Sequence, residues 1–232
     1  MALHVEESFW SLFPEAVIAV VVVHGLDNRN AAPKISARFD ASVARTAAAF
    51  EGADFANHEV IAPWRRAYQA FGAKPAKFRS SIEALIRSAV AGRLGAISPL
   101  VDLYNAISLD HFLPAGGEDL AKIEGDLVLT RAAGTEEFVP LGSVDNAPPA
   151  AGEVIYRDDR GVVCRCWNWR EADRTKLTAE TENAVLVLEA LGEIGRERLV
   201  AAAEDLAATV REIAASVRVE ILDASRPRVS LD

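Results

Sequence analysis

Three clusters of polar and aromatic residues in this sequence have types and spacing that suit chemistry or ligand binding. The first is the segment 74–81, KPAKFRSS, in which cations and hydroxyls precede a predicted helix. Fixed positive charges and the free N–H groups of a helix N-terminus both attract anions, so the segment suits a phosphate or a carboxylate. An ordinary helix start with basic flanks explains it equally well. The residues that would contact the anion are Lys74, Lys77, Arg79 and Ser80.

The second cluster lies in the apolar segment Leu100–Ser108, where Asp102 and Asn105 fall on adjoining turns of a predicted helix. A polar side chain in such a helix is destabilising unless it finds hydrogen-bond partners. We expect Asp102 to bond to neighbouring loops and Asn105 to face a pocket.

Two glycines further along, Gly116 and Gly117, come directly before Glu118. Glycines at a helix start can form a backbone nest that holds an anion or the oxyanion of an ester under attack, and a plain turn is the alternative. Beside such a nest, Glu118 can act as a base or bind an ammonium group of the substrate.

The third cluster is the segment Trp167-Asn168-Trp169-Arg170. If residues 162–169 form a strand, the two tryptophans face one way, and Asn168 and Arg170 face the other. Two tryptophans on one face can stack on a base, a ribose or an amino-acid side chain, and they can equally belong to the core.

Glu189 belongs with this cluster because it interrupts the apolar run 184–188. A carboxylate at the end of a buried strand needs a hydrogen-bond donor. The donor is either a protein cation such as Arg170, or a hydroxyl or ammonium group of a ligand.

The elements that must position these clusters are both helical and extended. The run Ala16–Val23 is β-branched and apolar on both faces, which predicts a central strand covered on each side. Helical patterns dominate before residue 113 and strand-like runs after it, without a regular βαβ alternation, which favours an α+β fold. We expect a mixed or antiparallel sheet or sandwich as the core, with flanking helices. Residues 1–222 are expected to form a single domain and residues 223–232 a C-terminal tail.

The boundaries of these elements follow from periodicity and from turn residues. Helices are predicted over Ala37–Glu51, His58–Phe71, Ser80–Leu94, Pro99–His111 and Arg196–Val217. Strands are predicted over Asp126–Arg131, Phe138–Leu141, Glu153–Tyr156, Val162–Trp169, Ala184–Leu191 and Val219–Leu222.

Composition and charge exclude several classes of protein. Among 232 residues, 50% are hydrophobic and 25% are charged, which is typical of a globular chain, and no apolar run is long enough for a membrane span. The net charge is −9, yet the stretch from residue 64 to residue 93 holds seven basic residues and one acid. This basic stretch can engage a polyanion, or it is a solvated helix face.

Metal and nucleotide chemistry are not indicated by the sequence. The four histidines lack metal-ligand spacing, the chain has no Walker or G-x-S-x-G motif, and the only cysteines are Cys164 and Cys166. We therefore expect no metal, no cofactor and no membrane contact. The small number of cysteines predicts a reducing, cytoplasmic location.

Several separated segments resemble one family in the same order along the chain. The segments SPLVDLYN (98–105), LAKIEG (120–125), LTAETEN (177–183) and VLE (187–189) are similar to the B3/B4 editing domain of the bacterial phenylalanyl-tRNA synthetase beta subunit. KPAKFRSS (74–81), PAGGED (114–119) and WNWR (167–170) resemble freestanding B3/B4-domain proteins more closely still. The resemblance runs from about residue 13 to residue 215.

The resemblance implies an activity and a set of site residues. In the synthetase, this domain hydrolyses the ester of tRNA mischarged with tyrosine, without a metal, and a glutamate binds the phenolic hydroxyl. By resemblance, Glu189 falls at that glutamate and Asn105 at the pocket asparagine. Gly116 stands where the synthetase has its site histidine, and Tyr104 stands where it has a threonine.

The leading hypothesis is a freestanding aminoacyl-tRNA deacylase that acts in trans on the 3′ end of a mischarged tRNA. The alternative is a non-catalytic module of the same fold that binds a tRNA end or an amino acid, and loss of the histidine favours it. A third possibility is a protein-interaction domain that uses the long C-terminal helix. In the first hypothesis the catalytic residues are Asn105, Gly116, Gly117 and Glu118, and the substrate-binding residues are Trp167, Asn168, Trp169, Arg170 and Glu189. In the second, the pocket is formed by Trp167, Arg170 and Glu189.

Overall fold

Two β-sheets packed face to face form the centre of the protein, and helices cover the outer face of one of them. The computed structural model describes residues 1–29, 32–192 and 194–232. The four-stranded sheet has the order β3 (Ala115–Asp119), β8 (Asn183–Ala190), β2 (Val17–Leu26) and β9 (Ala214–Leu222), with antiparallel pairing throughout. The six-stranded sheet has the order β10 (Arg228–Ser230), β1 (Ala2–Val5), β4 (Leu127–Arg131), β5 (Val154–Arg157), β6 (Val162–Arg165) and β7 (Arg170–Glu171).

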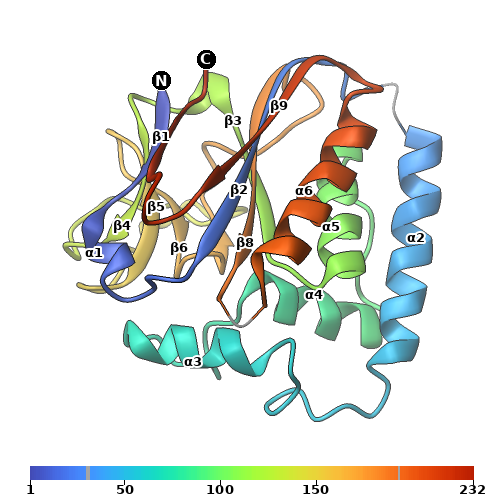
Figure 1. The fold of residues 1–232 in the computed structure, drawn as a ribbon, viewed down its shortest axis with the longest axis horizontal. Coiled ribbons are helices and arrows are strands. Elements are labelled where there is room, and N and C mark those ends of the chain that lie inside the picture. Colours follow the sequence, from blue (N-terminus) through green and yellow to red (C-terminus); the bar gives the residue numbers. More distant parts are fainter. Residues whose placement is uncertain (30–31, 193) are drawn as a thin grey trace.

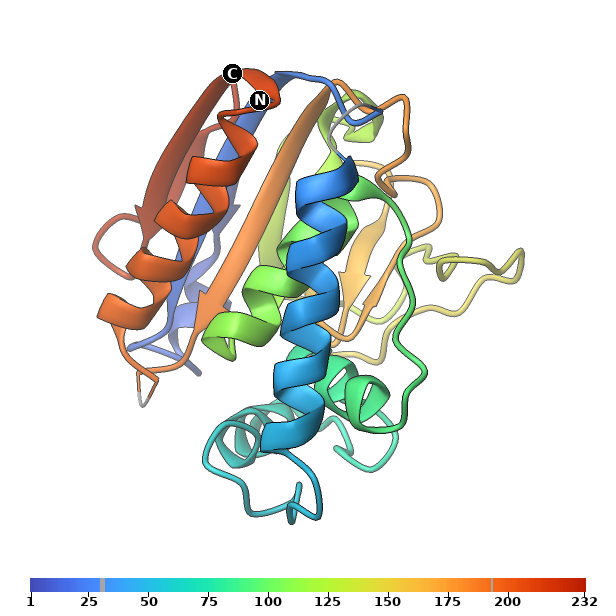
Figure 2. The same ribbon diagram turned by 90° about the vertical axis from the view of Figure 1, so that its right-hand side faces the viewer.

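The helices are arranged in two groups. Helices α5 (Pro99–His111) and α6 (Arg196–Val210) lie on the outer face of the four-stranded sheet, and α2 (Ala32–Ala49) lies outside α5 (Figure 1, Figure 2). Helices α3 (Ala62–Ala70) and α4 (Ser81–Val90) close one end of the layers. The short elements α1 (Glu7–Trp10) and the 3₁₀ turn η1 (Leu120–Lys122) complete the fold.

Strand β2 shows why the two layers form. Its alternate residues Ile18, Val20 and Val22 pack in the core between the sheets, whereas Ala19 and Val21 pack in the core under α5 and α6. A strand that is apolar on both faces needs cover on both sides, which the second sheet and the helices provide. The predicted α+β fold with a sheet sandwich and flanking helices is therefore confirmed.

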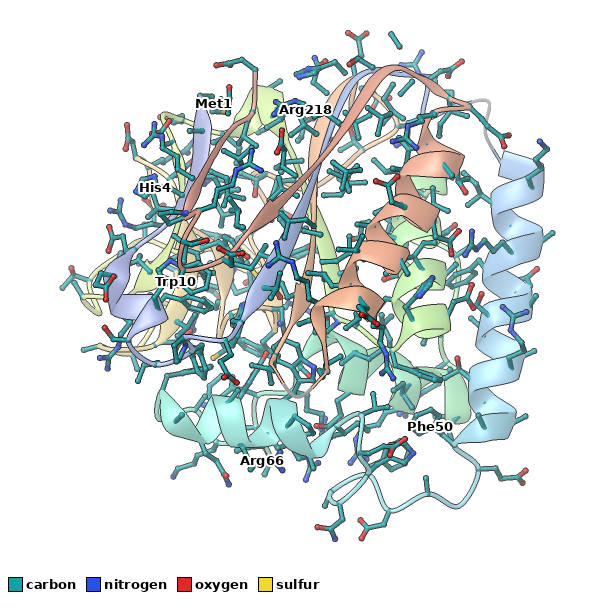
Figure 3. The ribbon with its side chains drawn as sticks, in the orientation of Figure 1. Met1, His4, Trp10, Phe50, Arg66 and Arg218 are labelled. Atoms are coloured by element: carbon teal, nitrogen blue, oxygen red, sulfur yellow. The ribbon has the colours of Figure 1, made fainter. Side chains whose placement is uncertain are left out.

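The C-terminal residues do not form a tail. Residues 228–230 are β10, which pairs antiparallel with β1, and the Val229 and Leu231 side chains are buried. Arg218 of β9 donates to the backbone oxygens of Ser230 and Asp232 at 2.9 and 3.0 Å. Figures 1 and 3 show the two ends of the chain side by side, with Met1 and Arg218 in the same region. The predicted tail over residues 223–232 is wrong because apolar residues within it complete the six-stranded sheet.

Two other element predictions need correction. The helix expected over residues 196–217 ends at Val210, and β9 begins at Ala214. Ile213 and Val217 continue the helical spacing by coincidence, while Val217, Val219 and Ile221 already have the period of a strand that pairs with β2. The apolar stripe of α6 is buried against the four-stranded sheet, so it is not an exposed interaction surface. Residues 138–141 form no strand and contribute one isolated bridge, Pro140 to Ala172.

Within the described part of the chain, no helix has both the length and the apolar character needed to cross a membrane.

Candidate functional site

A cavity of about 410 Å³ lies where α4, α5, β3, β8 and the end of the six-stranded sheet meet. This volume falls in the range of roughly 300–1,000 Å³ typical of small-molecule sites. The cavity is mostly apolar, with polar groups contributed by several elements. Its lining includes all nine residues expected at the cavity, namely Asn105, Gly116, Gly117, Glu118, Trp167, Asn168, Trp169, Arg170 and Glu189.

Glu189, the next-to-last residue of β8, is a deeply buried polar group of the cavity, with 1% of its surface exposed. The Tyr156 hydroxyl and the Trp167 indole N–H both donate to its Oε1 at 2.6 Å, and the Asn168 amide donates to Oε2 at 2.6 Å. Burial raises the pKa of Glu189 to about 7, although the three donors act to lower it. All three donors are neutral, and Arg170, the protein cation named as one possible donor, is not among them.

Arg170 points instead to the rim of the cavity. It is exposed, and its guanidinium donates to the backbone oxygen of Leu141 at 2.8 Å. Trp169 lies nearby, half-buried, with its ring edge-to-face against Phe78 at a centroid distance of 4.7 Å. These residues are available to a ligand at the mouth of the cavity.

Trp167 is a core residue and not a stacking wall. It is fully buried, and its ring packs against Phe9, Phe13 and Trp64 at centroid distances of 4.9, 4.9 and 5.0 Å. The expected strand over residues 162–169 ends at Arg165, and Cys166 and Trp167 then adopt positive φ angles of 45° and 65°. This turn breaks the alternation, so the Trp167 N–H and the Asn168 amide both reach Glu189.

Asn168 is held in place by a second set of contacts. Its Oδ1 atom accepts a hydrogen bond from the Tyr68 hydroxyl at 2.9 Å, which leaves its amide N–H group directed at Glu189. Tyr156, on β5, also donates a hydrogen bond to the Glu189 carboxylate. Tyr156 was not predicted as a site residue, because a tyrosine in an apolar strand is ordinarily a core residue.

Gly116 and Gly117 lie in the edge strand β3, so both alternatives, a nest at a helix start and a plain turn, are wrong. Pairing with β8 overrides the low strand propensity of the glycines. A Cβ on Gly117 would lie 2.5 Å from the Leu186 side chain, and a Cβ on Gly116 would lie 3.1 Å from Oε1 of Glu171. Close packing therefore explains the glycine pair. Asn105 lines the cavity from α5, with 7% of its surface exposed.

Glu118 interacts electrostatically with the carboxylate of Glu171, which was not predicted as a site residue. Burial raises the pKa of both groups, and the charge of Glu171 raises the pKa of Glu118 further. Oε2 of Glu118 is buried and has no hydrogen-bond partner among the described residues. Nothing in the local sequence marks Glu171, because the edge strands of two different sheets bring the pair together.

Asp102 has the structural role expected of it. Its Oδ1 atom accepts a hydrogen bond from the Ile97 backbone N–H at 2.7 Å, which fixes the loop before α5. In the part of the chain that the structure describes, no group of three or more histidine, cysteine, aspartate or glutamate residues could hold a metal ion.

Much of the basic stretch is engaged in ion pairs. Glu83 of α4 is buried, and Arg65, Arg87 and Arg79 approach its carboxylate at 2.6, 2.8 and 3.9 Å. Lys74 and Lys77 remain exposed on the segment before α4. Arg66 lies on the outward side of α3 (Figure 3).

Ser80 is buried and serves as the N-cap of α4, since its side chain accepts a hydrogen bond from the Glu83 N–H at 3.4 Å. Its hydroxyl is not available to an anion. Lys74, Lys77 and the half-exposed Arg79 are left as the candidates for that contact.

Comparison with known families matches residues 63–215 to the B3/4 domain. The chain belongs to the B3/4 domain family. The family resemblance predicted from the sequence is thereby confirmed, and the matched span contains every residue that lines the cavity. No curated protein sequence matches the chain.

Among solved structures, the B3/4 protein is similar to the crystal structure of an N-terminal fragment of the phenylalanyl-tRNA synthetase beta-subunit from Pyrococcus horikoshii, with 14% identity and a TM-score of 0.47. The alignment covers 94% of this chain and 49% of that fragment, so the chain spans about half the length of the fragment.

Proposed function

We propose that this B3/4 protein is a trans-acting, metal-independent aminoacyl-tRNA deacylase that hydrolyses the ester of a mischarged tRNA. The observation that carries the proposal is the cavity of about 410 Å³ that ends at the buried carboxylate of Glu189. A cavity of this size accepts an amino-acid side chain and the first part of the ribose to which it is esterified.

Glu189 is suited to select the acyl group. A carboxylate has about four acceptor positions, and Tyr156, Trp167 and Asn168 fill three of them. The remaining position takes one donor from the ligand, such as a hydroxyl or an ammonium group. A side chain that buries no donor there leaves the carboxylate under-satisfied, which disfavours its binding.

Hydrolysis of an aminoacyl ester needs little more than orientation, because the ester is already activated. Asn105 lines the same cavity as the glycines of β3, and its amide can donate to the ester carbonyl oxygen as negative charge develops there. One such donor lowers the barrier by about 3 kcal/mol. Glu118 lines the same cavity.

The basic segment before α4 supports a nucleic-acid substrate. Lys74 and Lys77 are exposed there, and α4 itself lines the cavity with Ser81 and Leu85. Phosphates of an acceptor stem bound to this segment would place the tRNA 3′ end near the cavity mouth.

The decisive experiment incubates the pure protein with a panel of tRNAs, each charged with a different amino acid. We expect release of the amino acid from at least one tRNA, at a rate that falls at least tenfold in Glu189→Gln. Glu180→Gln, which changes an exposed carboxylate, is the matched control and should keep the wild-type rate.

The same panel tests the alternative of a non-catalytic binding module, which the absence of a histidine side chain at Gly116 favours. Retention of one charged tRNA without release of its amino acid would establish that module. Neither release nor retention with any charged tRNA would contradict both functions.

A further inference from the structure

Two carboxyl groups from different sheets line the same cavity and interact electrostatically. Glu118 belongs to β3, an edge strand of the four-stranded sheet, and Glu171 belongs to β7, an edge strand of the six-stranded sheet. Both line the cavity. The carboxylate of Glu171 lies against Gly116, where a Cβ would approach its Oε1 to 3.1 Å. The missing side chain of Gly116 therefore makes room for the Glu171 carboxylate.

Glu118 has an unsatisfied atom at this site. The residue is 7% exposed, and its Oε2 is buried without a hydrogen-bond partner among the described residues. Burial of a carboxyl oxygen that has no donor disfavours the ionised form and raises the pKa of Glu118. A proton shared with Glu171 would supply the missing hydrogen bond.

The cations near the pair are bound to other groups. Arg174 donates to Asp158 at 2.5 and 2.9 Å, Arg170 donates to Leu141, and Lys176 donates to Asp173 at 2.9 Å. These contacts leave a shared proton as the simplest way to neutralise one carboxylate. The titratable and charged groups that face the pair are Tyr104, Asp158, Cys164, Arg170, Arg174, Lys176 and Glu189.

We infer that Glu171 is the general base of the ester hydrolysis proposed above, and that Glu118 is a positioning residue that holds a proton against it. This inference rests on the proposed deacylase function.

The surroundings of the two groups decide which one carries the proton. The backbone N–H of Gly117 and the charge of Arg170 lower the pKa of Glu171 against the effect of burial. Burial and the charge of Glu171 raise the pKa of Glu118 well above its ordinary value, although a hydrogen bond with Thr175 and the charge of Arg174 act to lower it. The pKa of Glu171 rises to about 7, so above neutral pH the proton resides on Glu118 and Glu171 is the ionised partner.

The reaction balances with no other reactant than water. Glu171 takes a proton from a water molecule as the water oxygen bonds to the ester carbon, which gives a tetrahedral oxyanion. The bond from that carbon to the ribose oxygen then breaks, and the ribose oxygen receives the proton from Glu171. The products are an amino acid and a tRNA with a free hydroxyl, and the pair again holds one proton.

Two isosteric variants test the assignment with a tRNA that the wild-type protein deacylates. In Glu171→Gln, kcat should fall by roughly 10²–10⁴-fold with little change in KM, because a general base is lost. In Glu118→Gln, the amide replaces the protonated acid as the donor to Glu171, and kcat should stay within about threefold of wild type. The fall of kcat at acidic pH should persist in Glu118→Gln.

Unchanged kcat in Glu171→Gln, or an equal loss in both variants, would overturn the inference. Infrared difference spectra at pH 8, above the pKa of about 7 of Glu189, provide a readout that needs no activity. The wild type should show a protonated carboxyl band that is absent from Glu118→Gln. A wild type that shows this band but deacylates no tRNA would contradict the proposed function and leave the proton-sharing pair intact, whereas absence of the band would refute the pair itself.

Discussion

Glu189 combines two properties that rarely occur together in one carboxyl group. It is almost completely buried, and all three of its protein partners are neutral donors. Burial therefore dominates, and the pKa of Glu189 rises to about 7. Close to neutral pH the group changes between an acceptor-only carboxylate and an acid that can donate, so ligand preference at the end of the cavity should depend on pH.

This raised pKa predicts a measurable effect on stability. The folded pKa of about 7 exceeds the ordinary value of 4.5, so the folded protein retains the Glu189 proton that the unfolded chain has released. The stabilisation is complete below about pH 4.5 and disappears as the pH rises through 7. Between pH 4.5 and pH 8 the unfolding free energy of Glu189→Gln should gain about 3 kcal/mol relative to wild type.

Urea denaturation of both proteins at several pH values measures this difference. Glu180→Gln, an exposed change, should give a curve parallel to that of wild type at every pH. A Glu189→Gln curve that also stayed parallel would show that the carboxyl group titrates alike in the folded and unfolded states.

At the scale of elements, helix α4 connects the cavity to the basic surface. One face contributes Ser81, Leu85 and Ser88 to the cavity lining, and the buried Glu83 binds arginines from α3, from the preceding segment and from α4 itself. The ion-pair cluster fixes α3 against α4. Since Tyr68 of α3 orients Asn168, the cluster also supports the hydrogen bonds to Glu189.

Glu83→Gln should lower the free energy of unfolding by about 3 kcal/mol. The substitution removes the buried negative charge that neutralises three arginines and leaves the arginines to repel one another. Thermal or urea unfolding at neutral pH measures the loss. The matched control is Glu212→Gln, which changes an exposed ion pair with Lys34 and should cost less than about 1 kcal/mol. Equal losses in the two variants would show that the Glu83 cluster is an ordinary surface network.

Local patterns predict the elements that bury an apolar face and fail where long-range pairing decides the structure. Pro99 and the buried leucines of α5 fix that helix at its predicted bounds, and the doubly apolar β2 is the central strand expected. Strand β3, with two glycines and two acids, has no strand signal of its own and forms because it pairs with β8. The turn at Cys166 depends on packing around Trp167, which residue spacing does not encode.

The candidate site shows the same division. Glu189 is detectable in the sequence because a carboxylate interrupts an apolar run, and Asn105 because an amide lies in an apolar helix. Tyr156 and Glu171 are not detectable, because their partners come from other strands and other sheets. The site residues that could not be predicted are therefore those whose roles depend on contacts between distant segments.

At the scale of the whole molecule, a net charge of −9 coexists with an exposed basic segment next to the cavity. The acidic remainder repels nucleic acid in most orientations, whereas Lys74 and Lys77 attract it in one. For the tRNA substrate proposed above, this charge distribution would favour encounters in which the nucleic acid approaches the cavity.

Binding of a tRNA acceptor stem should accordingly weaken with salt, and the double variant Lys74→Ala/Lys77→Ala should weaken it at every salt concentration. Each lysine that neutralises a phosphate adds about 0.9 to the slope of log K against log salt, so loss of both should flatten the slope by about 2. Lys34→Ala, which removes an exposed lysine on α2, is the control and should leave the slope unchanged. Fluorescence anisotropy with a labelled stem measures both quantities. If the double variant kept the wild-type slope, the acceptor stem would contact another face, and the path of a tRNA 3′ end into the cavity past α4 would have to be abandoned.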